Sequence, residues 1–239
     1  MSAKVQAHAN HSLQTVSKDF TQDFTANASQ DSAKTSTQTP TKTTSQSQKS
    51  PNNLSAKLKR IILIRHADSM DREIFAKSCK TTKTPHNDML RPLTKKGKIQ
   101  SENIASFVQN FLHTQKTPIS CVLTSPAKRT IQTIKPLSKV LKKVPCQLCD
   151  FISPDCGIEG YEKAIYANDE LAQTLVLVGH EPDLGEFVKY ALGVAHLDAL
   201  EFPKGVIIEL KKKPKVKNLQ GGFTLSLFIP PKYLPKYLA

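Results

Sequence analysis

Long apolar runs are missing from this sequence. No apolar run approaches the ~18 residues that a membrane-spanning helix needs. The first 56 residues also lack the apolar core of a secretory signal, and with three Asp and no Arg they do not resemble a transit peptide. We therefore expect a cytoplasmic protein that makes no contact with a membrane.

Cysteine is scarce, and the number of cysteines is odd. Five Cys in a chain without a secretory signal argue against a disulfide framework and favour a reducing compartment. Cys146 and Cys149 have C-x-x-C spacing, with Cys156 nearby, but a zinc site would need a fourth ligand and no second C-x-x-C exists. A thioredoxin-type pair would start a helix, whereas this pair follows one. We expect neither a metal nor another cofactor.

Acidic residues are few compared with basic ones. Twenty Asp and Glu stand against 34 Lys and Arg, giving a net charge of +14. Such a charge favours phosphorylated substrates, nucleic acid or anionic membranes as partners, although it can equally serve solubility. The densest basic run, 211–217, lacks the aromatic residues that stack on bases. A solvated hairpin tip is the better interpretation of this run, and we expect no specific nucleic-acid partner.

The chain divides into a tail and one domain. Residues 1–56 are dominated by Gln, Ser, Thr, Asn, Ala and Lys, and this composition cannot bury enough apolar surface to offset the entropy of ordering. We expect a disordered tail over 1–56 and a folded domain over 57–239.

Within the domain, short apolar segments alternate with amphipathic ones, which predicts an α/β fold. The expected strands are 60–65, 121–125, 174–178, 206–210 and 223–229. Helices are expected after Thr94, which suits an N-cap, after Pro126, over 158–172, and from Asp183 to Gly193, with Asp183 and Glu186 as a capping box. The polar segment 68–91 shows no sustained period, and we expect it to cross over the mouth of the pocket.

Three of the expected strands end in residues suited to binding phosphate. Arg65 and His66 follow the first strand, Arg129 comes one turn into the helix after the second, and His180 follows the third. Open α/β sheets bind ligands at the carboxyl ends of their strands. The planar guanidinium group of Arg can donate two parallel hydrogen bonds to phosphate oxygens. A neutral His can attack phosphorus through a ring nitrogen. Two Arg and two His at one edge therefore predict phosphoryl chemistry.

Four motifs occur in an order that resembles the histidine phosphatase superfamily, which includes phosphoglycerate mutases. They are L-I-R-H-A at 63–67, R-P-L-T-x-x-G at 91–97, S-P-A-K-R-T-x-Q-T at 125–133 and V-G-H-E-P at 178–182. The sequence is most similar to the SixA-type phosphohistidine phosphatases, and P-P-K-Y-L at 230–234 matches their usual ending. The resemblance implies a three-layer α/β/α sandwich with a mostly parallel central sheet. It also implies that His66 is the phosphorylated nucleophile, with Arg65, Arg129 and His180 binding the phosphate.

The sequence departs from the mutase pattern in ways that bear on the substrate. Ala67 and Asp68 replace the Gly and nearby Asn of that pattern, and residues 150–157 hold no clear counterpart of its acidic Glu. A phosphomonoester needs its alkoxide leaving group protonated, whereas phosphohistidine leaves as an imidazole that is easily protonated near neutral pH. Asp88 is the one acid candidate and a candidate substrate-binding residue, with a loop-capping carboxylate as the alternative.

Three functions remain open. The first is a metal-independent phosphatase that acts on phosphohistidine in a protein and passes through a phosphohistidine intermediate of its own. The second is a phosphatase for a small phosphomonoester. The third is a catalytically idle module that binds phosphorylated partners, and the complete set of two Arg and two His counts against it.

Overall fold

The computed structural model of the protein describes residues 53–114, 118–196 and 200–237. Most of the expected tail, 1–56, lies outside these residues. Residues 53–56 lie against the domain: Leu54 is buried, and its N–H donates to the Lys217 carbonyl at 2.6 Å. In the described part of the chain, no helix combines the length and apolar character needed to cross a bilayer.

The apolar run after Lys59 forms a central strand, β1 (Arg60–Arg65). Ile61 and Leu63 belong to one apolar cluster of the core, whereas Ile62 and Ile64 belong to the other. This division follows from the two-residue period of a strand whose two faces are both covered. On one side β1 pairs in parallel with β4 (Thr174–Gly179), so that Arg65 lies opposite Gly179.

The sheet has six strands in the order β3-β2-β4-β1-β5-β6. The strands not yet located are β2 (Cys121–Thr124), β3 (Cys146–Leu148), β5 (Ile207–Lys212) and β6 (Phe223–Ile229). The first four strands of this order run parallel, β5 is antiparallel to β1, and β6 is antiparallel to β5. The carboxyl ends of β1, β2 and β4 therefore meet at one edge of the sheet, as the motifs required.

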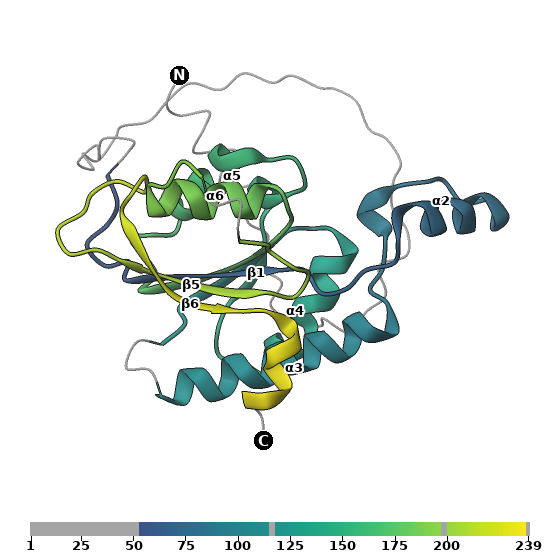
Figure 1. The fold of residues 1–239 in the computed structure, drawn as a ribbon, viewed down its shortest axis with the longest axis horizontal. Helices are drawn as coiled ribbons and strands as arrows, with labels where there is room; N and C mark the ends of the chain where they lie inside the picture. The colour runs from purple at the N-terminus through teal and green to yellow at the C-terminus, as the bar shows by residue number, and fades with distance from the viewer. Residues whose placement is uncertain (1–52, 115–117, 197–199, 238–239) are drawn as a thin grey trace, which may run out of the picture.

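Helices cover both faces of the sheet, as Figure 1 shows. One layer holds α3 (Lys95–Thr114) and α4 (Lys128–Val140), and the other holds α5 (Gly157–Tyr166) and α6 (Asp183–Leu192). The described residues also form three short 3-10 helices: η1 (Asp88–Leu90), η2 (Asp150–Ile152) and η3 (Pro231–Tyr237). The expected three-layer α/β/α sandwich with a mostly parallel sheet is confirmed.

The loop after β1 is fixed by the start of α3. The Thr94 hydroxyl accepts a hydrogen bond from the Gly97 N–H at 3.0 Å, which confirms Thr94 as the N-cap. Gly97 packs directly on the backbone of Asp68, because a Cβ at position 97 would lie 1.9 Å from the Asp68 carbonyl oxygen. This close approach holds the chain that leads away from His66.

The expectation that residues 68–91 cross over the site is wrong for α2 (Arg72–Thr81), a helix within this segment. The Asp71 carboxylate caps α2 by accepting from the N–H groups of Glu73 and Ile74. Of the α2 residues only Cys79 is buried, so this helix packs little apolar surface against the rest of the domain. Figure 1 shows α2 extending away from the sandwich instead of lying over it.

Candidate active site

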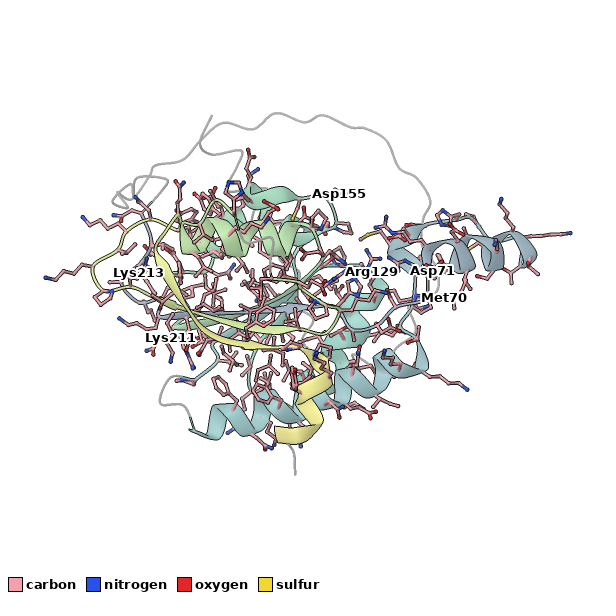
Figure 2. All side chains as sticks on the ribbon, viewed as in Figure 1. Met70, Asp71, Arg129, Asp155, Lys211 and Lys213 are labelled. Carbon is pink, nitrogen blue, oxygen red and sulfur yellow. The ribbon has the colours of Figure 1, made fainter. Side chains whose placement is uncertain are left out.

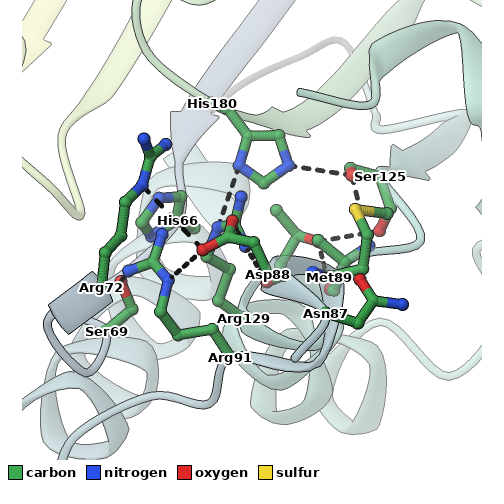
Figure 3. Close-up of polar contacts among 12 residues, drawn as sticks. His66, Ser69, Arg72, Asn87, Asp88, Met89, Arg91, Ser125, Arg129 and His180 are labelled. Atoms are coloured by element: carbon green, nitrogen blue, oxygen red, sulfur yellow. Dashed lines mark hydrogen bonds and ion pairs between the residues drawn. The ribbon is translucent and has the colours of Figure 1, made fainter. Parts of the chain in front are cut away.

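The four residues expected to form the site meet at the carboxyl edge of the sheet. Arg65 ends β1 with His66 directly after it, Arg129 lies in the first turn of α4, and His180 follows β4. The ring centroids of His66 and His180 are 5.3 Å apart, and Arg129 Nε lies 3.3 Å from His180 Nδ1. Figure 3 shows the side chains of His66, Arg129 and His180 converging from three segments that are distant in the sequence.

His66 is held as a neutral imidazole with one free nitrogen lone pair. Its Nδ1 lies 2.8 Å from the Ala67 carbonyl oxygen, and because that oxygen can only accept, Nδ1 carries the proton. Nε2 therefore carries the lone pair. Burial lowers the pKa of His66 to about 3, and the charges of Arg129 and Arg65 also lower it, against the hydrogen bond to Ala67. A histidine in this state is a competent nitrogen nucleophile at neutral pH.

His180 is fixed in the opposite tautomer. Arg129 Nε can only donate, so His180 Nδ1 accepts, and the proton lies on Nε2. That Nε2 donates to Ser125 Oγ at 2.9 Å. Burial lowers the pKa of His180 to about 2, and the neighbouring Arg129 and His66 also lower it. The free protein therefore holds two neutral histidines beside cationic arginines.

Arg65 adds positive charge near His66 and contributes to the lowered pKa of that histidine. Its Nη1 donates to the Phe202 carbonyl, while its Nε is buried and has no hydrogen-bond partner among the described residues. Glu181 interacts electrostatically with Arg65, and its carboxylate accepts from the Gly185 N–H at 3.2 Å. Burial raises the pKa of Glu181 to about 7, although Arg65 opposes the shift. Glu181 is thus a second carboxyl group near the site.

Asp88 lies among three guanidinium groups (Figure 3). Its Oδ2 is 3.1 Å from Arg129 Nη1, and its Oδ1 is 2.8 Å from Arg91 Nε and 3.9 Å from Arg72 Nε. Burial alone would raise the pKa of Asp88, but the hydrogen bond from Arg91 and the charge of Arg129 outweigh it and lower the pKa. Asp88 is therefore ionised at neutral pH, so it has no proton to donate in the free protein. The loop-capping alternative does not describe it either, because Asn87 caps η1.

Sequence reasoning gave no role to three residues that complete this arrangement: Arg91, Ser125 and Glu181. Arg91 is buried, and its Nη1 donates to Ser69 Oγ at 2.8 Å, which fixes the guanidinium that faces Asp88. All three lie inside motifs that the sequence comparison had singled out. Membership of a motif was the available signal, but their partners are set by contacts between segments far apart in the chain.

No set of three or more His, Cys, Asp or Glu side chains in the described ranges is arranged to hold a metal ion. Burial raises the pKa of Cys146 and Cys149 to about 11 in both cases, so the two thiols of the C-x-x-C pair are protonated at neutral pH.

Comparison with protein families finds a match over the first part of the domain. Residues 61–153 match the histidine phosphatase superfamily (branch 1). The resemblance read from the sequence is thereby confirmed, and the match to this superfamily supports phosphatase activity. A search of curated proteins found no match.

Solved structures share the fold. The phosphohistidine phosphatase SixA of Agrobacterium tumefaciens aligns with a TM-score of 0.57 at 22% identity, covering 73% of this chain and 99% of that one. A protein histidine phosphatase SixA complexed with tungstate aligns with a TM-score of 0.53 at 22% identity over the same shares of both chains. An α-ribazole-5'-P phosphatase of Escherichia coli aligns with a TM-score of 0.50 at 15% identity, covering 73% of this chain and 97% of that one. At these identities the likeness establishes the fold.

The two neutral histidines predict that the protein loses stability as the pH falls below neutral. An unfolded histidine has a pKa of about 6.5, whereas His66 and His180 have values of about 3 and about 2 in the fold. Below the unfolded value, the unfolded state therefore binds more protons and the free energy of unfolding decreases. Glu181, whose pKa is raised, opposes this loss as the pH falls through about 7.

Denaturant titrations between pH 7.5 and 5.5 test this prediction. The free energy of unfolding should decrease over this range, and it should decrease more steeply in Glu181→Gln, which lacks the opposing carboxyl group. A free energy of unfolding that stays level or increases in Glu181→Gln as the pH falls would contradict the neutral state of the two histidines.

Proposed function

We propose that this protein is a metal-independent phosphatase that removes phosphate from phosphohistidine in another protein, by way of a phosphohistidine intermediate on His66. The observation that carries the proposal is the state of His66, which is buried and neutral and is pinned through Nδ1 so that Nε2 is the free nucleophile. Arg65, Arg129 and His180 surround it and would bind the transferred phosphoryl group.

The reaction would proceed in two displacements. In the first, Nε2 of His66 forms a bond to phosphorus as the substrate's P–N bond breaks, and the electron pair of that bond remains on the substrate imidazole, which takes up a proton. In the second, a water oxygen bonds to phosphorus, the bond to Nε2 breaks and its electron pair returns to His66. One proton of the water stays on the phosphate, and the other passes to solvent, which supplied the proton that the substrate imidazole took up in the first step.

The surrounding groups would stabilise the charge on the transferring phosphoryl group. Phosphoryl transfer depends mainly on positioning and electrostatics, and Arg129 and Arg65 supply fixed positive charge. A bound phosphate dianion would raise the pKa of His180, because negative charge favours the imidazolium form. Even when neutral, His180 can donate its Nε2 proton to a phosphate oxygen in place of Ser125 Oγ, and Ser125 retains a hydroxyl proton for the same purpose.

The leaving group favours a P–N substrate. Asp88, the carboxylate nearest Arg129, is ionised and paired with arginines, so it offers no proton to an alkoxide. An imidazole leaving group needs no strong acid near neutral pH. Asp88, the one acid candidate in the sequence, is thus better suited to orienting Arg129 and Arg91 so that they can bind the substrate.

A second candidate, a phosphatase for a small phosphomonoester, is favoured by one observation. Glu181 has a pKa of about 7 and interacts with Arg65, so part of its population is protonated at neutral pH. If Glu181 protonated an alkoxide leaving group, Glu181→Gln would abolish turnover of phosphomonoesters and spare turnover of P–N substrates.

Phosphate release from two substrates in the presence of EDTA tests the proposal. We expect the protein to dephosphorylate a domain that carries phosphohistidine with a kcat/KM at least tenfold above that for p-nitrophenyl phosphate, and EDTA to leave both rates unchanged. A preference for phosphomonoesters would move the function to the second candidate. Activity that EDTA abolishes would contradict metal independence.

Asp88→Asn is expected to strengthen inhibition by inorganic phosphate. The substitution removes a carboxylate that competes with phosphate for Arg129, and the size of such charge contacts suggests a decrease of about tenfold in the inhibition constant. The kcat for the P–N substrate should fall by less than about tenfold. A loss of kcat of about 100-fold or more would instead assign Asp88 to acid catalysis.

A further inference from the structure

The segment 71–87, named here the arm, leaves the rim of the site and extends into solvent. It begins at Asp71, and its next residue, Arg72, lies 3.9 Å from the Asp88 carboxylate. From there α2 runs outward (Figure 1). A ten-residue helix has little stability by itself in water, so an exposed helix of this length gains from being covered by a partner.

The outer part of the arm is basic. Lys77, Lys80 and Lys83 are all exposed, and residues 76–87 contain no Asp or Glu. Ile74, with 59% of its surface exposed, adds an apolar side chain on the same helix. These features suit a protein surface that presents carboxylates around an apolar contact.

Only a large substrate can contact the outer part of the arm while its phosphoryl group is bound at His66. At a rise of about 1.5 Å per residue, Lys77 and Lys80 lie about 8 and 12 Å along α2 from Arg72 at the rim. A small phosphorylated molecule seated on His66 would not reach them. A folded domain that inserts a phosphorylated side chain would place its surface against this helix.

We propose that the arm is the docking surface for the phosphohistidine-bearing protein, and that it engages an acidic face beside the phosphorylated side chain. The inference rests on the proposed function and adds the surface that selects a protein substrate over a small one. The partner's carboxylates pair with Lys77 and Lys80, and steer the phosphoryl group toward Arg65 and Arg129.

The basic run 211–217, the other basic region of the chain, does not take part in this docking. Lys211 and Lys213 lie at and beyond the end of β5, which is antiparallel to β1, so they occupy the opposite edge of the sheet. Figure 2 shows both lysines on the far side of the molecule from Arg129 and Asp71.

The test compares Lys77→Glu/Lys80→Glu with a matched control, Lys142→Glu/Lys143→Glu. The control changes two exposed lysines that follow the end of α4, at the edge opposite the site. Two substrates are used: phosphoramidate, which is too small to reach the arm, and a purified acidic domain phosphorylated on histidine. Rates are measured at about 0.05 M and 0.5 M salt, because charge pairing at a surface is screened at the higher concentration.

We expect Lys77→Glu/Lys80→Glu to lower kcat/KM for the phosphorylated domain by about tenfold at low salt, mainly through KM, with a smaller effect at high salt. Turnover of phosphoramidate should be unchanged, and the control pair should alter neither substrate. Equal rates for the variant and the unchanged protein on the phosphorylated domain would overturn docking and leave the proposed function intact. Parallel losses on both substrates would also overturn it, by showing a general effect on the fold. Failure of the unchanged protein to turn over either substrate would overturn the proposed function itself, and the docking role with it.

Discussion

Replacing His66 with alanine is expected to lower phosphate release by roughly 1,000-fold or more, because no other group can take the phosphoryl group at this position. The expectation follows from the fixed tautomer: Nδ1 is engaged with the Ala67 carbonyl oxygen, so all nucleophilic capacity lies on Nε2. Incubation with 32P-labelled substrate followed by rapid quenching should trap acid-labile label on the unchanged protein and none on His66→Ala.

The matched control for this experiment is His196→Ala, which removes an exposed histidine that is not part of the site. It should retain both full turnover and the labelled intermediate. Circular dichroism would confirm that each variant is folded. Acid-labile label on His66→Ala at the level of the unchanged protein would show that another residue is the nucleophile.

Replacing Arg129 with glutamine should be the second most damaging change, lowering kcat/KM by roughly 100- to 1,000-fold. Arg129 makes three contacts that no other side chain can replace: Nη1 with the Asp88 carboxylate at 3.1 Å, Nη1 with the Asp88 carbonyl oxygen at 2.9 Å, and Nε with His180 at 3.3 Å. Its loss removes charge facing the phosphate and also frees the tautomer of His180. Steady-state kinetics and inhibition by inorganic phosphate would measure both effects.

Lys128→Gln is the control for this charge change. It removes one positive charge, as Arg129→Gln does, but from the exposed residue next to Arg129. It should change kcat/KM by less than about twofold. Arg129→Lys separates charge from geometry: we expect it to recover little activity, because an ammonium group cannot contact His180 and bind phosphate in the same planar arrangement. Nearly full activity in Arg129→Lys would indicate that net charge alone is needed.

The positions of Arg65, His66, Arg129 and His180 were predictable because a short, largely apolar strand ends at or shortly before each of them. Such strands give a strong signal, and parallel strands bring their carboxyl ends to one edge. The alternation along β1, with Ile61 and Ile62 on opposite faces, follows directly from the strand period. Gly193 also ends α6 as expected, with φ of 73°.

Other elements gave too little signal to predict. Strand β3 has three residues, Cys146–Leu148, all half-buried at the edge of the sheet. The helix expected over 158–172 ends at Tyr166, since the chain continues into a turn without apolar period. The capping box at the start of α6 is wrong: Asp183 instead accepts from the N–H groups of Asp155 and Gly157. That role depends on a loop 26 to 28 residues earlier in the chain, which local sequence cannot reveal.

The pairing of Asp88 with arginines was also beyond sequence reasoning. Its separation from Arg91 is short, but its contact with Arg129 joins residues 41 apart in the chain. The sequence therefore identified a carboxylate near the site but not its protonation state. That state decides whether Asp88 can donate a proton or instead orients the arginines.

The place of β4 in the sheet has a consequence for how the protein is made. β4 is inserted between β2 and β1, although the chain reaches it only after β3. While residues up to 173 leave the ribosome, β1 and β2 have no partner strand between them. Each therefore exposes unpaired backbone N–H and C=O groups along one edge, which can pair with a wrong strand. The pocket closes only when residues separated by more than a hundred positions meet, which predicts slow folding from high contact order.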